Sequence, residues 1–128
     1  MNIKLLGIDL AKNVFQLCGV DVQGHTVYSR RVRRDDLLST IAQIPVCTIV
    51  VEACAGCFFW QRHFERLGHA VRIISPQYVK PYRKYQKNDS NDAEAICIAA
   101  QQRHMPFVPA RSIEQQDIQT LHRARSAW

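Results

Sequence analysis

The stretch Val46-Cys47-Thr48-Ile49-Val50-Val51, residues 46–51, carries the strongest fold signal in the chain. Successive residues of a strand point to opposite sides of a sheet, so this run places apolar side chains on both faces. Strands of that kind are typical of the centre of a sheet that is covered on both sides. The run therefore predicts a central strand of an α/β fold, and a carboxylate, Glu52, follows it directly.

Strand patterns surround this run. We expect further strands over residues 3–10, 14–21, 25–32 and 70–75. The first three are close in sequence, and Val22-Gln23-Gly24 is a hairpin signal, so they predict an antiparallel meander. The third strand is expected to be the more exposed one, because Arg30, Arg31 and Arg33 crowd its end.

Helical spacing of apolar residues predicts helices over residues 37–44, 58–67 and 89–104. Asp35 or Asp36 is expected to cap the first of them, and Gly68 is the residue type preferred just past the end of the second. Three meandering strands followed by helix-strand-helix-strand-helix predict an α/β fold, a five-stranded mixed sheet flanked by helices.

The composition points to a polyanionic partner. The chain has 128 residues, a formal net charge of +6 and a pI near 9.3, which favours nucleic acid or an anionic membrane. No apolar run is long enough to span a bilayer, and Asp9 interrupts the N-terminal run that a signal peptide would need. We expect a cytoplasmic protein with no membrane partner.

Five cysteines are present, mostly within apolar segments, which indicates buried and reduced thiols. Cys54-Ala55-Gly56-Cys57 has the spacing of a zinc knuckle or a redox motif. No second pair of Cys or His residues stands at the right distance to complete four ligands. A tight turn with two small residues is the favoured interpretation.

Four acidic residues form the main chemical signal: Asp9, Glu52, Asp89 and Asp92. Asp9 lies late in the first strand and Glu52 ends the central one, whereas Asp89 and Asp92 are three residues apart and share a helical face. Carboxylates at two neighbouring strand ends and on one helix face can converge on a divalent cation. Such an all-oxygen set suits Mg²⁺ or Mn²⁺ and predicts a site for phosphoryl transfer.

Each acid also has an ordinary structural explanation. Asp9 alone is typical of a turn, and Glu52 can end a strand at the surface. Asp89 and Asp92 suit the N-terminal end of a helix dipole. The set of four favours a metal, because gathered carboxylates repel one another and stay partly protonated without a counter-ion.

The segment over residues 78–87 interleaves tyrosines with cations, which suits phosphate contacts and stacking on unpaired bases. We predict that it binds nucleic acid through Tyr78, Lys80, Tyr82, Arg83, Lys84 and Lys87, with Lys12 as a further phosphate contact. The alternative is a solvated basic loop whose tyrosines pack on the core.

Five short motifs, taken in order, resemble those of the DEDD transposases of bacterial insertion sequences, the group that includes the pilin-gene invertase. They lie at residues 7–12, 51–56, 68–72, 76–80 and 87–93, and include Gly7-Ile8-Asp9-Leu10-Ala11-Lys12 and Lys87-Asn88-Asp89-Ser90-Asn91-Asp92-Ala93. The resemblance covers nearly the whole chain. It implies a RuvC-like domain of the ribonuclease H-like fold, in which Asp9, Glu52, Asp89 and Asp92 are the catalytic, metal-binding tetrad.

The same resemblance implies metal-dependent DNA strand cleavage and transfer during recombination. It also implies a structured guide RNA for some members and a homo-oligomer for the full-length protein. Members continue into a helical segment and a second domain with a serine nucleophile, and we do not expect this chain to contain either in full. We expect residues 1–110 to be the RuvC-like DEDD domain and residues 111–128 to begin a helical linker, with the chain inactive alone.

Two other classes compete with this hypothesis. Actin-like sugar kinases and ATPases also carry Gly-Ile-Asp on a first strand, but they need a glycine-rich phosphate hairpin, and Leu10-Ala11-Lys12-Asn13 supplies no glycine. A non-catalytic nucleic-acid-binding module is the second alternative. Divalent-metal binding separates it from a transposase, since a pure binding module has no use for four gathered acids.

The basic segment gives a first prediction. Replacing Lys80, Arg83, Lys84 and Lys87 together with alanine should weaken nucleic-acid affinity and flatten its dependence on salt. Each lost phosphate contact lowers the slope of log K against log salt by roughly 0.9 for duplex DNA. Titration of a labelled duplex at several salt concentrations measures both quantities. An unchanged affinity and slope would show a merely solvated face.

Overall fold

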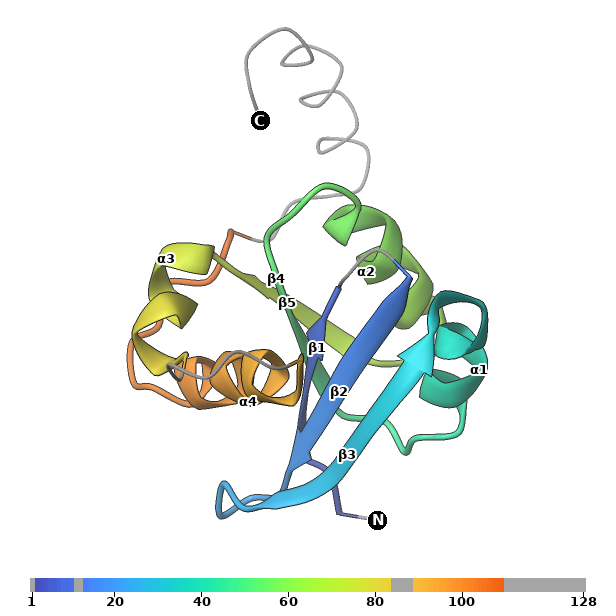
Figure 1. Cartoon of the computed structure of the whole chain (residues 1–128), viewed down its shortest axis with the longest axis horizontal. Coiled ribbons are helices and arrows are strands. Elements are labelled where there is room, and N and C mark those ends of the chain that lie inside the picture. Colours follow the sequence, from blue (N-terminus) through green and yellow to red (C-terminus); the bar gives the residue numbers. More distant parts are fainter. Residues whose placement is uncertain (1, 11–12, 84–88, 110–128) are drawn as a thin grey trace, which may run out of the picture.

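The computed structural model describes residues 2–10, 13–83 and 89–109 of the chain. In this part the elements are, in order, β1 (Leu5–Asp9), β2 (Val14–Val20), β3 (Thr26–Arg33), the 3-10 turn η1 (Arg34–Asp36), α1 (Leu37–Ala42), β4 (Thr48–Glu52), α2 (Cys57–Arg66), β5 (Ala70–Ile74), α3 (Pro76–Val79), the 3-10 turn η2 (Lys80–Tyr82) and α4 (Asp89–Ala100). The five strands form one sheet in the order β3-β2-β1-β4-β5 (Figure 1).

The strand pairing confirms the predicted mixed sheet. β1 pairs antiparallel with β2, and β2 pairs antiparallel with β3, which makes the meander. β1 also pairs in parallel with β4, and β4 pairs in parallel with β5. β4 is therefore an interior strand, as its two apolar faces predict. Parallel pairing of β1 and β4 brings the carboxyl ends of both strands to the same edge of the sheet.

Helices cover both faces of the sheet (Figure 1), with α1 and α2 on one side and α3 and α4 on the other. Ile49 and Val51 of β4 belong to the core cluster that includes Trp60 and Phe64 of α2. Val50, between them, packs in the second cluster with Ile96 of α4. Alternate residues of β4 thus stabilise opposite layers, which explains why the run is apolar throughout.

α4 approaches β1 closely at Gly7. A Cβ atom at this position would lie 2.7 Å from the Sγ of Cys97 and 2.9 Å from the carbonyl oxygen of Ala93. Both distances are shorter than van der Waals contact, so only glycine fits here without a shift of α4. Asp9 stands two residues after Gly7, and Asp92 stands one residue before Ala93. The missing side chain therefore brings two of the predicted acidic residues toward the same region.

α4 ends earlier than the sequence predicts. Helical spacing indicated a helix to residue 104, but the α-helix stops at Ala100. The amides of Gln101 and Gln102 donate to the carbonyls of Ile98 and Ala99, three residues back, which tightens the last turn. His104 has a φ of 61°, in the left-handed region, so the helix cannot continue through it.

The predicted side-chain cap of α1 is also wrong. Asp36 occupies the N-cap position of α1. A capping residue normally has an extended backbone, but Asp35 and Asp36 both belong to the 3-10 turn η1, which precedes α1 directly. The φ and ψ of Asp36 are −100° and −2°, and its side chain makes no capping hydrogen bond. Its carbonyl oxygen instead accepts from the Oγ1 of Thr40 at 2.8 Å. Gly68, by contrast, has a φ of 98° just after α2, as predicted.

A buried histidine joins α1 to the start of β4. The Cys47 amide donates to the Nδ1 of His69 at 3.2 Å, and the Nε2 of His69 lies 3.2 Å from the carbonyl oxygen of Ile41. Both contacts are satisfied when the proton is on Nε2. His69 thus links the end of α1 to the residue before β4, a structural role that the sequence did not reveal.

In the part of the chain that the structure describes, no helix has the length and apolar character needed to cross a membrane. Residues 111–128, expected to begin a helical linker, lie outside the described residues.

The contact at Gly7 generates a stability prediction. Gly7→Ala should lower the free energy of unfolding by about 1–3 kcal/mol, because the added methyl group overpacks the interface between β1 and α4. Chemical denaturation measures the loss. Cys97→Ala in the same background removes the sulfur but leaves the Ala93 carbonyl, so it should restore only part of the stability. A change within about 0.5 kcal/mol would contradict the close approach.

Candidate metal centre at the carboxyl ends of β1 and β4

Asp9 and Glu52 end neighbouring parallel strands. Ile8 of β1 is level with Val51 of β4, so the two acids that follow stand at matching positions at the same sheet edge. Gly7 faces α4 and Val50 packs against it. Because side chains alternate along a strand, Asp9 and Glu52 also project from the α4 face. Both residues are half-buried.

Asp92, near the start of α4, meets Glu52 through a shared cation. The Nη2 of Arg83 donates to the two carboxylate oxygens of Glu52 at 2.7 and 2.6 Å. The Nε of the same guanidinium lies 3.3 Å from the Oδ1 of Asp92. One positive group therefore bridges a strand-end acid and a helix acid that are far apart in sequence. The sequence placed Arg83 in the basic segment, and nothing in its spacing indicated this bridge.

The Arg83 bridge is partly shielded from water. The side chains of Arg83 and Glu52 are 28% and 17% exposed, and that of Asp92 is 29% exposed. Burial alone would lower the pKa of Arg83, but its contacts with Glu52 and Asp92 outweigh that effect and raise the pKa above its usual value. The guanidinium is thus permanently charged and acts as an internal counter-ion for the two carboxylates.

Cys54 lies beside the same acids. Its pKa is raised to about 11, chiefly by partial burial of the thiol and then by electrostatic repulsion from Cys57, Glu52 and Asp9. Cys54 stands two residues after Glu52 in the turn that follows β4, and β1, which ends at Asp9, is the neighbouring strand. Cys54 is exposed and Cys57 is buried, and all five cysteines are free thiols. The turn begins α2, with Gly56 at a φ of 90° in the N-cap position, as the favoured tight-turn interpretation expects.

The fourth acid is only partly described. α4 begins at Asp89, so its backbone stands in the first turn of that helix, but its side chain lies outside what the structure describes. Among the described residues, no three His, Cys, Asp or Glu side chains gather closely enough to hold a metal ion. The structure thus brings Glu52 and Asp92 together through Arg83, with Asp9 at the end of the neighbouring strand. The four-carboxylate centre stays a prediction.

Parts of the predicted nucleic-acid segment have definite places. Tyr78 and Tyr82 are half-buried against the cluster that contains Val50 and Ile96, which agrees with the core-packing alternative. Lys80 is exposed in η2. Lys12, Lys84 and Lys87 lie outside the described residues.

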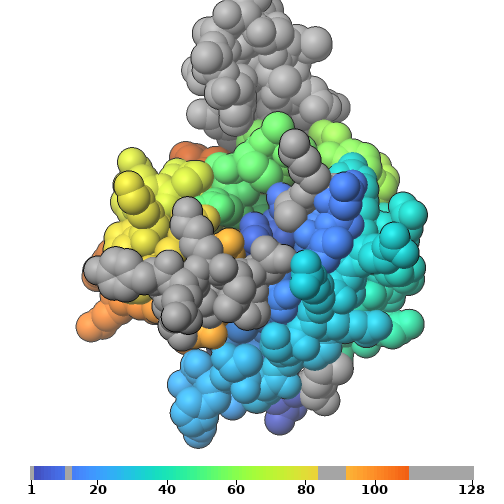
Figure 2. Space-filling model, in the orientation of Figure 1, coloured from blue at the N-terminus to red at the C-terminus, as the bar shows by residue number. Residues whose placement is uncertain are grey.

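The edge strand β3 supplies a second basic surface. Arg30, Arg31, Arg33 and Arg34 are exposed on β3 and η1, and we name them the β3 flank. Figure 2 shows the cyan side chains of this region along one side of the visible face. Gln16 pairs with Asp9 on one side and with Arg31 on the other, so Arg31 of the flank shares a row of the sheet with the acid. The sequence showed these arginines but not the alignment of Arg31 with Asp9.

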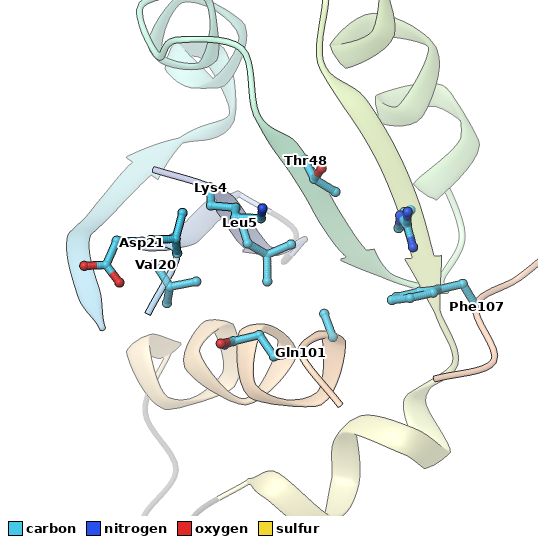
Figure 3. A pocket seen from close by; sticks show the side chains of 10 residues that line it. Lys4, Leu5, Val20, Asp21, Thr48, Gln101 and Phe107 are labelled. Atoms are coloured by element: carbon cyan, nitrogen blue, oxygen red, sulfur yellow. The ribbon is translucent and has the colours of Figure 1, made fainter. Parts of the chain in front are cut away.

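A separate hollow lies at the other end of the sheet (Figure 3). It has a volume of about 370 Å³ and lies where β1 and β4 begin, between Leu5 and Thr48. Lys4, Arg72 and Gln101 also line it. The hollow is thus at the opposite strand ends from Asp9 and Glu52, and it takes no part in the acidic site.

The family model and the curated relatives that match this chain are all transposases. Residues 6–128 match the family model of the IS110-type DEDD transposases, described as "Transposase". The chain is 50% identical over 124 residues to a transposase for insertion sequence element IS1111A from Coxiella burnetii, covering 97% of the chain and 34% of that relative. It is 48% identical over 126 residues to a probable family 20 transposase from Pseudomonas aeruginosa, covering 98% and 37%. The chain spans about a third of the length of these curated relatives.

A solved structure shares the fold. Thermus thermophilus RuvC in complex with a Holliday junction substrate aligns with a TM-score of 0.58 at 14% identity, covering 74% of this chain and 90% of that one. A second Thermus thermophilus RuvC structure aligns with a TM-score of 0.54 at 12% identity, covering 74% of this chain and 90% of that one. At such identities the similarity shows architecture. The chain therefore has the RuvC-like, ribonuclease H-like fold that its motifs implied.

The environment of Cys54 predicts how fast its thiol is alkylated in the folded protein. At pH 7–8 the thiol should react slowly with iodoacetamide, and the rate should rise through pH 11, where the thiolate forms. Glu52→Gln removes one of the negative charges and should shift the profile to lower pH. Mass spectrometry follows the modification, with Glu65→Gln on α2 as the control. A profile centred near the ordinary thiol value, and unmoved by Glu52→Gln, would contradict the placement of Cys54.

Proposed function

Since this chain belongs to the IS110 family of DEDD transposases, we propose that it is the metal-binding part of a recombinase. In this proposal Asp9, Glu52, Asp89 and Asp92 hold Mg²⁺ or Mn²⁺ at the carboxyl ends of β1 and β4. The reaction class is cleavage and transfer of DNA strands, performed by the full-length protein and not by this chain alone.

One observation carries the proposal. Glu52 from β4 and Asp92 from α4 already converge on a single positive charge, the Arg83 guanidinium, beside the strand that ends in Asp9. The contacts support the proposal, because gathered carboxylates are stabilised by a nearby positive charge. Carboxylate oxygens are also the ligands that hard divalent cations prefer, so the donor set fits the metal.

Two of the four acids are held by strands and two by a helix. Asp9 and Glu52 sit at the ends of buried, paired strands, which hold their positions rigidly. Asp89 and Asp92 come from the first turn of α4, whose position over the sheet is set by the Gly7 contact. A divalent cation bound there supplies a Lewis acid for a phosphate oxygen and a means of activating an attacking hydroxyl group. The protein side chains fix where the scissile phosphate must lie.

DNA is the proposed substrate. The net charge of +6, the β3 flank and the exposed Lys80 all favour a polyanion. Arg31 of the flank shares a row of the sheet with Asp9, so a phosphate bound by this arginine would lie on the same row of the sheet as the acid. A structured guide RNA and a homo-oligomer are part of the same proposal for the full-length protein, and they rest on the family resemblance.

A non-catalytic nucleic-acid-binding module is the second candidate. One observation favours this binding module: the Arg83 guanidinium already neutralises Glu52 and Asp92 without any metal. Divalent-metal binding at the acids separates the two candidates. The actin-like ATPase alternative has no support from the family match.

Manganese titration tests the proposed function. The 128-residue chain should bind Mn²⁺ weakly by calorimetry, and more tightly with a short DNA duplex present, because phosphates complete the ligand set. Asp9→Asn should weaken binding by at least the roughly 10–100-fold that loss of an outer-shell partner costs. The fold should stay intact or become slightly more stable, since the change relieves repulsion.

Glu65→Gln, at an exposed position of α2, is the matched control and should leave Mn²⁺ affinity unchanged. If Asp9→Asn and Glu52→Gln also leave it unchanged, the catalytic proposal fails and the binding module remains.

A further inference from the structure

Resting on the proposed function, we propose that Arg83 is a tethered cation that occupies the acidic site until nucleic acid arrives. In this role its guanidinium neutralises Glu52 and Asp92 in the free chain. It then exchanges those carboxylates for a phosphate of the substrate and leaves them to the divalent metal.

The contacts of Arg83 occupy the oxygens that a metal would need. Both carboxylate oxygens of Glu52 accept from its Nη2, at 2.7 and 2.6 Å. The Oδ1 of Asp92 lies 3.3 Å from its Nε. A metal ion that binds Glu52 on the side that faces Arg83 competes with the Nη2 contacts for the same two oxygens. Arg83 is therefore a direct competitor for Glu52 and not a distant neighbour of the site.

Electrostatics makes the two cations exclusive. A guanidinium and a divalent ion held by the same carboxylates would lie within a few ångströms of each other, and their repulsion is strong where water is partly excluded. The three side chains are each less than a third exposed, so screening by solvent is limited. The site thus accommodates either Arg83 or the metal on Glu52 and Asp92.

A phosphate offers Arg83 an equivalent partner. The planar guanidinium forms paired hydrogen bonds with phosphate as readily as with carboxylate. Arg83 directly follows η2, where Lys80 is exposed to solvent as a neighbouring positive charge. Substrate phosphate at this place both holds the released arginine and adds oxygen ligands for the metal. Metal binding and nucleic-acid binding are therefore positively coupled through one side chain.

The coupling gives a reason for the bridge. A free chain that gathers acids without a counter-ion would suffer repulsion, and one that binds metal permanently could act on any nucleic acid it met. An internal cation removes the repulsion between the acids in the free chain. It also makes metal binding depend on a correctly placed phosphate.

Arg83→Gln tests the exchange in the 128-residue chain. Loss of the competing cation should tighten Mn²⁺ binding about tenfold without DNA, consistent with removal of charge-assisted contacts. The same change should weaken binding of a short DNA duplex. It should also reduce the increase in Mn²⁺ affinity that the duplex causes. Arg83→Lys keeps the charge and should keep Mn²⁺ affinity within a few fold of the parent.

Calorimetry with Mn²⁺ alone, with duplex alone and with both gives the three quantities, and thermal unfolding checks that each variant is folded. If Arg83→Gln lowers or does not alter Mn²⁺ affinity while Asp9→Asn weakens it, Arg83 is a fixed structural clamp and the exchange is wrong, but the metal site stands. If neither the parent nor Arg83→Gln binds Mn²⁺ at these acids, the proposed function fails. Should Arg83→Gln not fold, an Arg83→Lys chain with greatly altered Mn²⁺ affinity would overturn the exchange.

Discussion

The parallel pairing of β1 with β4 is the constraint on which the acidic site depends. It sets Ile8 level with Val51 and thereby places Asp9 and Glu52 at one sheet edge. Carboxylates held this way repel one another, and the backbone hydrogen bonds of the two strands prevent them from moving apart. The conflict must be relieved by a cation, and in this structure Arg83 supplies it to Glu52 and Asp92. Packing and electrostatics are thus coupled at one point of the fold.

α4 completes the arrangement through an unusually close contact. The absence of a side chain at Gly7 lets Ala93 and Cys97 approach β1, and the same approach carries Asp92 toward Glu52. Residues from the first strand and the last helix of the described chain therefore meet. The distance between α4 and β1 thus depends on a single glycine.

The sequence predicted much of the fold because its signals were local. The apolar run before Glu52 identified the interior strand, and the hairpin signal at Gly24 identified the meander. It failed at the end of α4, where a left-handed His104 stops a helix that apolar spacing alone would continue. It failed also at Asp36, because η1 changes the backbone of a residue whose type suggested a cap.

The acids themselves were visible from their types and positions, but their electrostatic partner was not. Arg83 lies 31 residues from Glu52 and belongs to a segment whose charges suggested phosphate contacts. Only the folded chain shows that its guanidinium lies between Glu52 and Asp92. Such long-range pairings depend on the path of η2 over the sheet, which no local pattern encodes.

We propose that the carboxyl ends of β1 and β4 hold a divalent cation when nucleic acid is present. The most direct measurement is an anomalous difference map from crystals that contain the chain, a short DNA duplex and Mn²⁺. The account predicts a manganese peak about 2 Å from carboxylate oxygens of Asp9 and Glu52, with the Arg83 guanidinium moved onto a phosphate. An Arg83–Glu52 contact that persists in those crystals, with manganese absent from these acids, would contradict it.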